Sequence, residues 1–151
     1  MNTTRSRPDP DDDQIVAAMA AHPPEKWREL FTKMDALTSA DLRVEWHGGN
    51  EVRPGVRHMP YPVYGDAVRA IQLALAELNV VVVFDWQTWM ADHAYSAERV
   101  PRLSVADTAR LATAIIRGER FHDGAIAQAI DSGVFTAILD RLRTWHETER
   151  G

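Results

Sequence analysis

The sequence contains no cysteine, so disulfide bridges, thiolate nucleophiles, iron–sulfur clusters and cysteine-type zinc sites are excluded. It also lacks an apolar run of the roughly 20 residues that a membrane-spanning helix needs, since its most apolar run, residues 80–84, is far shorter. The first residues are polar and hold no hydrophobic core of a secretory signal. From these absences we expect a cytoplasmic protein with no membrane role.

Positive charge is in the minority, because 17 Lys and Arg stand against 22 Asp and Glu and give a formal net charge of −5. General nucleic-acid binding is therefore not expected, since it needs a basic patch that neutralises phosphates. The phosphate-binding P-loop, the G-x-G-x-x-G and G-x-S-x-G motifs and the zinc-protease helix are all missing. The six histidines show no H-x-x-x-H or H-E-x-x-H spacing. We predict no metal site and no cofactor.

The overall composition is that of a globular domain. The chain has 151 residues, of which 45% are hydrophobic and 26% charged, so it is long enough to bury a core without covalent staples. Its polar, proline-containing start predicts a flexible tail over residues 1–10. We expect residues 11–150 to form a single globular domain.

Apolar residues recur at helical spacing in most of the chain. The clearest case is Trp27, Leu30, Phe31 and Met34, which follow a proline suited to the first turn of a helix. Other helices are expected between Asp11 and Pro23, around Val68 to Leu78, at Asp85 to Met90, from Ser104 to Gly118, from Asp123 to Gly133, and from Phe135 to about Trp145.

Two segments are expected to be strands. From Leu42 to His47 the residues alternate between apolar and polar, which predicts a half-buried strand of a β-hairpin. The turn falls at residues 48–50 or at 54–55, and the return strand near residues 56–59. The β-branched run at 80–84 predicts a buried strand that joins this hairpin. The fold class is therefore α+β and predominantly helical, with about six to seven helices around a small β-hairpin or sheet.

Four sequence blocks occur together in one order. They are Trp46-His47-Gly48-Gly49, Met59-Pro60-Tyr61-Pro62-Val63-Tyr64, Phe84-Asp85-Trp86 and Arg117-Gly118-Glu119-Arg120-Phe121. With its Pro-Tyr-Pro, Phe-Asp-Trp and Arg-x-Glu-Arg-Phe blocks, the sequence resembles an uncharacterised family of bacterial and phage domains. The resemblance covers residues 46 to 142 and leaves the N-terminal forty residues outside it. It implies a whole-domain fold and transfers no activity.

The leading candidate site is the corner of residues 117–123, between two expected helices. Arg117 and Arg120 can bind phosphate or carboxylate groups through two parallel hydrogen bonds, and His122 lies beside them. Asp123 begins the next helix, whose N-terminal amides favour a bound anion. The more common role of such residues is structural, because they cap helices and bind loop carbonyls at a corner.

Aromatic residues in loop-like segments form a second candidate. A pocket that they line would accept a planar ligand or a peptide, although packing in the core is the more common role. The aromatic candidates are Trp46, Tyr61, Tyr64, Trp86 and Trp89. Asp85 is either a functional acid beside them or, more commonly, the cap of the helix that follows.

A third candidate is the pair Glu45 and His47, which share one face of the expected strand and form a possible acid–base pair. Together with Glu119 they are the weak catalytic candidates, and His58 lies on the return strand.

Two functions follow from these candidates. The first is a binding module for a small anionic ligand or a protein partner. The alternative is a small hydrolase or transferase that acts on a phosphorylated or glycosidic substrate. The two differ in whether the face of Glu45 and His47 shares a pocket with the 117–123 corner. The oligomeric state stays open.

Overall fold

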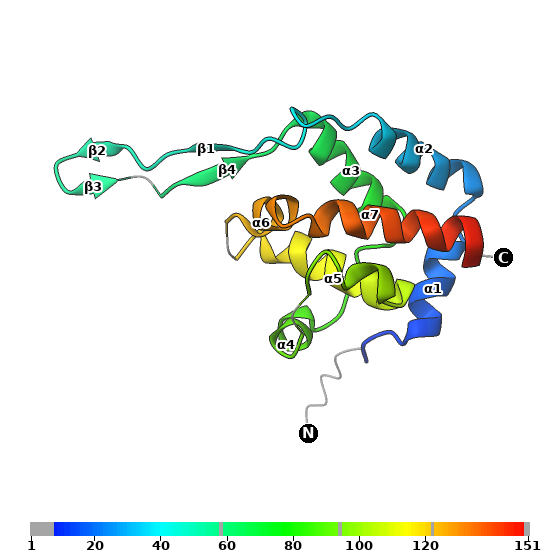
Figure 1. The fold of residues 1–151 in the computed structure, drawn as a ribbon. Coiled ribbons are helices and arrows are strands. Elements are labelled where there is room, and N and C mark those ends of the chain that lie inside the picture. Colours follow the sequence, from blue (N-terminus) through cyan, green and yellow to red (C-terminus); the bar gives the residue numbers. More distant parts are fainter. Residues whose placement is uncertain (1–7, 58, 94, 122, 150–151) are drawn as a thin grey trace, which may run out of the picture.

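Helices make up most of the molecule, and a β-hairpin projects from them (Figure 1). This computed structural model describes residues 8–57, 59–93, 95–121 and 123–149. The described helices are α1 (Asp12–Ala20), α2 (Pro24–Asp35), α3 (Asp66–Glu77), α4 (Trp86–Ala91), α5 (Val105–Gly118), α6 (Ala125–Asp131) and α7 (Val134–Thr144), with a 3₁₀ turn at Val100–Arg102 and a π-helical end at Trp145–Glu149. The strands are β1 (Glu45–His47), β2 (Glu51–Arg53), β3 (Val56–Arg57) and β4 (Tyr61–Val63). The predicted α+β, predominantly helical class is confirmed.

Local side chains start three of these helices. Asp11 accepts the backbone N–H of Gln14 at 2.9 Å, and the Gln14 side chain accepts the Asp11 N–H in return, which forms a capping box at α1. Ser104 accepts the N–H of Asp107 at 3.0 Å and caps α5. Asp85 caps α4 in the same way. Helices that begin near all three positions were expected from the sequence, and Asp85 was expected as a cap.

The core lies where α1, α6 and α7 pack against α5 and where α2 packs against α3 (Figure 1). Trp27 on α2 is fully buried and meets Trp145 edge-on, with ring centroids 5.1 Å apart. Leu111 on α5 and Ile138 on α7 are buried within the same cluster. The apolar faces predicted from helical spacing are therefore the faces that the structure buries. Among the described residues, none of the helices combines the length and apolarity needed to cross a bilayer.

The hairpin of residues 45–63, here called the arm, extends away from the helices (Figure 1). β1 pairs antiparallel with β4, with Glu45 opposite Val63, Trp46 opposite Pro62 and His47 opposite Tyr61. β2 pairs with β3 beyond it, so the chain reverses at residues 54–55. The expected half-buried strand is wrong for β1, because all three of its residues are exposed. An arm that leaves the body has no core beneath it.

A glycine separates the two halves of the arm. Gly48 has φ +85°, and a Cβ built there would lie 2.6 Å from the carbonyl oxygen of Met59. Both the backbone conformation and this close approach therefore require glycine. The structure uses both of the turns expected from the sequence. The strands are interrupted at residues 48–50, and the chain reverses direction at residues 54–55.

The prediction of a buried strand at residues 80–84 is wrong. Val80 is buried, but Val83 is 82% exposed, and the segment pairs with no strand among the described residues. Its backbone binds a side chain of α5 instead, because the Thr113 hydroxyl accepts the N–H of Val82 at 2.8 Å and lies 3.2 Å from the carbonyl oxygen of Val80. A helix side chain thus satisfies groups that a sheet would otherwise bond.

The predicted N-terminal tail falls mostly on residues 1–7, which lie outside the described residues. Asp9 within it accepts the backbone N–H of Asp85 at 3.3 Å, so the start of the described chain reaches the cap of α4.

Candidate functional site

A cleft of about 320 Å³ opens where the segment before α4 meets the end of α5. We call it the arginine cleft. Its lining residues are Val82, Val83, Phe84, Trp86, Arg117, Arg120 and Phe121. Three of the ligand-binding candidates named from the sequence, Trp86, Arg117 and Arg120, are therefore brought together.

The cap of α4 fixes the aromatic wall of the arginine cleft. The Asp85 carboxylate accepts the N–H of Thr88 at 3.2 Å and its hydroxyl at 2.7 Å. These hydrogen bonds to Thr88 lower the pKa of Asp85, so the cap stays ionised. Trp86 follows at the first position of the helix and meets Phe121 with ring centroids 5.9 Å apart. Asp85 thus has the capping role, the commoner of its two expected roles.

The two arginines of the cleft differ from Arg110 and Arg141, two other arginines of the helical body. Arg110 is held by Asp12 and Asp107 at 2.6 and 2.7 Å, and Arg141 by Glu149 at 2.6 Å. Within the part of the chain that the structure describes, Arg117 and Arg120 form neither an ion pair nor a hydrogen bond through their side chains. Their guanidinium groups are free to bind an anion.

Glu119, between these arginines, has a different role. One carboxylate oxygen accepts the Tyr64 hydroxyl at 2.7 Å and the N–H of Ile126 at 2.8 Å, and the other accepts the N–H of Gly124 at 2.8 Å. The Tyr64 hydroxyl in turn accepts the N–H of Ala127 at 3.0 Å. Both side chains therefore satisfy amides at the start of α6, a capping role that the sequence had suggested for Asp123.

Burial and the hydrogen bond to Glu119 raise the pKa of Tyr64 well above its usual value. The phenol therefore stays protonated and keeps donating to the carboxylate. Through these hydrogen bonds, Tyr64 at the end of the arm is connected both to α6 and to Glu119 of the 117–123 corner.

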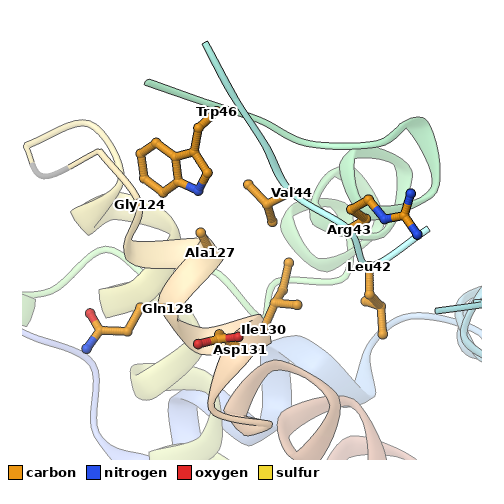
Figure 2. Close-up of a pocket in the computed structure, with 9 residues that line it drawn as sticks. All are labelled: Leu42, Arg43, Val44, Trp46, Gly124, Ala127, Gln128, Ile130 and Asp131. Carbon is orange, nitrogen blue, oxygen red and sulfur yellow. The ribbon is translucent and has the colours of Figure 1, made fainter. Parts of the chain in front are cut away.

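A second cleft, of about 500 Å³, lies between the base of the arm and α6 (Figure 2). We call it the tryptophan cleft. It is lined by Leu42, Arg43, Val44, Trp46, Gly124, Ala127, Gln128, Ile130 and Asp131. Gly124 has φ +102°, and a Cβ there would lie 2.8 Å from the Trp46 ring, so only glycine lets the indole lie over the start of α6.

Glu45 and His47 lie side by side, as the strand pattern predicts, with 3.4 Å between a carboxylate oxygen and Nε2. Because neighbouring strand residues point to opposite faces, this pair faces away from α6, which Trp46 covers. The His47 ring also stacks on Tyr61 across the strand pair, at 5.9 Å between centroids. The face of Glu45 and His47 is therefore turned away from the tryptophan cleft.

The remaining candidates do not line either cleft. Trp89 contacts the rings of His93 and Tyr95, with centroids 4.4 and 5.4 Å away, and packs against the core. His58 and His122 lie outside the described residues. In the described ranges no three His, Asp or Glu side chains are grouped so as to hold a metal ion.

Sequence reasoning missed the apolar wall of the arginine cleft. Val82 and Val83 were assigned to a buried strand, and Phe121 was noted only as part of a sequence block. The exposure of Val83 could not be predicted from the sequence, because the β-branched run at 80–84 has the composition of a buried strand. The one sequence signal for Phe121 was its place directly after Arg120.

Comparison with known proteins gives one match. The model of a family of unknown function, DUF6508, matches residues 22–148. The match confirms the resemblance to an uncharacterised family, but it starts at residue 22 rather than near residue 46, so α2 lies within the family. Neither the curated proteins nor the solved structures yielded a match. The chain therefore belongs to the DUF6508 family, whose function is unknown.

Proposed function

We propose that the protein is a binding module and that its arginine cleft accepts a small anionic ligand with a flat apolar part. The proposal rests above all on one observation, two arginines without an acidic partner at the rim of an aromatic cleft, among the described residues. The two guanidinium groups suit a phosphate or carboxylate, and Trp86 and Phe121 suit a ring.

Exposure of the apolar wall supports the same proposal. Phe121 is 73% exposed and Val83 is 82% exposed, although both lie beside partly buried aromatic residues. Large apolar side chains gathered at a concave surface are typical of ligand sites, whereas scattered ones need no explanation. The proposal also includes the cytoplasmic location and the bacterial or phage origin expected from the sequence, and no role in general nucleic-acid binding.

The alternative function, a small hydrolase or transferase, has less support. Its best form needs Glu45, His47 and Glu119 to converge with Arg117 on one cleft. Instead Glu119 gives both carboxylate oxygens to the cap of α6, and Glu45 and His47 lie on the exposed arm. This arrangement favours binding over acid–base catalysis.

Thermal unfolding in the presence of matched probes tests the proposal. The probes are naphthyl phosphate, inorganic phosphate and naphthol, and a panel of nucleotides and aryl carboxylates extends them. We expect naphthyl phosphate to raise the unfolding midpoint more than either half alone. A ligand present at about 100 times its Kd stabilises the native state by roughly 2.7 kcal/mol, which moves the midpoint by several degrees.

Single variants locate the site. Arg117→Ala and Arg120→Ala should each weaken naphthyl phosphate binding roughly tenfold or more, because a hydrogen bond to a charged group contributes about 1.5–3 kcal/mol. Arg69→Ala is the matched control, since Arg69 is an exposed arginine of α3 outside the cleft lining. Equal binding by all three variants, or no stabilisation by any anionic probe, would overturn the proposal.

A further inference from the structure

A third cleft lies between α4, α5 and α6. We call it the apolar cleft. Its volume is about 390 Å³, which lies within the range typical of small-molecule sites. Helices α4 and α5 contribute six of its lining residues: Trp86, Met90, Leu111, Ala114, Ile115 and Gly118. None of the described residues that line it has a charged side chain, so it suits an uncharged part of a ligand.

The apolar cleft adjoins the arginine cleft at two aromatic residues. Trp86 and Phe121 line both clefts, and their ring centroids are 5.9 Å apart. Arg117 and Arg120 line the arginine cleft but not the apolar cleft. A ligand whose anionic group binds these arginines therefore has an apolar surface directly beyond the aromatic pair.

The apolar cleft extends along α5, away from the arginines. Gly118 follows Arg117 in the sequence, whereas Leu111 lies two helical turns earlier, about 10 Å away at 1.5 Å per residue. Helix α6 returns alongside α5 (Figure 1), and its lining residues range from Ala125 to Ser132 at the end of the helix. The apolar cleft is therefore elongated, with the anion site at one end.

Gly118 leaves room where the two clefts meet. Its φ does not lie in the left-handed region, so its backbone conformation does not require glycine. A Cβ built there would lie 3.8 Å from both the Ala125 Cβ and the Trp86 ring, which is ordinary contact, so packing does not require glycine either. Alanine would stabilise the helix more than glycine does. The missing side chain instead leaves an edge of the Trp86 ring open to a ligand that passes from one cleft to the other.

From this arrangement we infer that the ligand of the arginine cleft is an elongated single-chain amphiphile. Its phosphate or carboxylate head binds Arg117 and Arg120. Its flat part contacts the aromatic pair, and its aliphatic tail lies in the apolar cleft. The inference rests on the proposed function, because the arginine cleft supplies the anion site, and it adds the class of ligand. A compact anion such as a nucleotide would leave the apolar cleft unused.

The polar groups of the lining are few, which favours an aliphatic tail over a peptide. Apart from the indole N–H of Trp86, the described lining offers polar side chains only at Tyr95, Gln128 and Ser132. An aliphatic tail needs no hydrogen-bond partner, whereas a peptide backbone carries an N–H and a C=O at nearly every residue. The apolar cleft therefore matches a hydrocarbon chain better than a segment of protein.

Calorimetric titration with a series of probes tests the tail site. The probes are para-alkylphenyl phosphates with ethyl, butyl, hexyl and octyl chains, each used below its critical micelle concentration. We expect the affinity to rise about fourfold for each methylene group that the apolar cleft takes up, because each leaves water for an apolar lining. The heat-capacity change of binding should become more negative along the series, as burial of apolar surface requires.

Variants that fill the apolar cleft locate the tail. Ser132→Phe narrows the far end, where Ser132 is exposed, and Ala114→Leu fills the middle. Each should weaken binding of the octyl probe roughly tenfold or more, the loss of about two methylene contacts, and weaken the ethyl probe much less. Ser39→Phe is the matched control and should leave the whole series unchanged, since Ser39 is an exposed serine outside both clefts. Arg120→Ala should weaken every probe by the same factor and keep the gain per methylene.

The outcomes separate this inference from the proposed function. Equal affinity for the ethyl and octyl probes, with both weakened by Arg120→Ala, overturns the tail site and leaves the anion site standing. Absence of binding by every probe overturns both. A gain with chain length that Ser132→Phe and Ala114→Leu leave intact, or that appears only above the critical micelle concentration, also overturns the tail site. Circular dichroism confirms that the variants keep their helices, and either filling variant is sufficient if the other does not fold.

Discussion

Tyr64 and Glu119 stabilise the start of α6 from outside the helix. The residue at its N-cap is Gly124, which has no side chain, and the free amides of the first turn are bonded by the Glu119 carboxylate and the Tyr64 hydroxyl. The phenol must keep its proton to donate to Glu119 at 2.7 Å. Stability should therefore depend on the ionisation of this one phenol.

The pKa of Tyr64 is raised in the folded protein from a usual value of 10.0. Below about pH 10 both the folded and unfolded states hold the proton, so its contribution is fully present. Above that pH the unfolded chain loses the proton first, and stability falls as the pH rises towards the folded-state pKa. We expect the free energy of unfolding, measured in urea, to fall as the pH rises above about 10.

Tyr64→Phe tests the assignment of this pH dependence. It should lower stability at neutral pH by about 1–3 kcal/mol, because Glu119 and the N–H of Ala127 each lose a partner. It should also show a shallower loss above about pH 10, since the ring no longer ionises. Burial raises the pKa of Tyr95 too, so a smaller loss remains in the variant. An unchanged pH profile would assign the effect to another tyrosine.

At this scale the sequence predicts roles that are local along the chain. Asp85 and Ser104 bond residues three positions later, and capping patterns of that spacing can be recognised directly. Tyr64 and Glu119 are 55 positions apart, and their contact depends on how the arm joins the body. That contact could not be predicted, and neither could the structural role that it gives to Glu119.

Among the elements, the arm is the least connected to the body. Every described residue from 50 to 60 is exposed, whereas Trp46 and Tyr64 hold the base of the arm against α6. The outer half should therefore contribute little to the stability of the helices. Replacing residues 48–60 by Asn-Gly would join His47 and Tyr61, which already lie opposite each other, through a two-residue turn.

We expect this shortened arm to change the free energy of unfolding by less than about 1 kcal/mol, because substitutions at exposed positions have small effects. Urea unfolding monitored by circular dichroism measures the change. Loss of cooperative unfolding would show instead that the outer strands support the helices.

Strands were harder to predict than helices for a physical reason. Alternation from Leu42 to His47 correctly indicated β structure only at Glu45–His47, and alternation reports two unlike faces without saying what covers the apolar one. In the arm that face meets α6 only at its base. The run at 80–84 failed differently, because β-branched residues can also lie extended against a helix whose side chains bond their backbone, as Thr113 does.

In the molecule as a whole, the helical faces could be predicted and the clefts could not. Helical spacing identifies a buried face from residues within a few turns, so Leu111 and Ile138 were assigned correctly. The arginine cleft joins residues near position 83 to residues near 120. Such a junction depends on the packing of α4 against α5, which no local pattern records.

The burial of α7 in the core allows a quantitative prediction. Ile138 on α7 is 3% exposed and borders a small apolar gap with Leu75, Ile126 and Phe135. Ile138→Ala removes buried methyl groups and enlarges this gap, so it should lower the free energy of unfolding by about 2–5 kcal/mol.

Leu73→Ala is the matched control, since Leu73 is 62% exposed on α3 and should change stability by no more than about 0.5 kcal/mol. Urea titrations of both variants compare a buried with an exposed aliphatic side chain on one scale. Equal losses would mean that α7 does not bury this face, and the packing of α7 against α5 and α6 would then need a different arrangement.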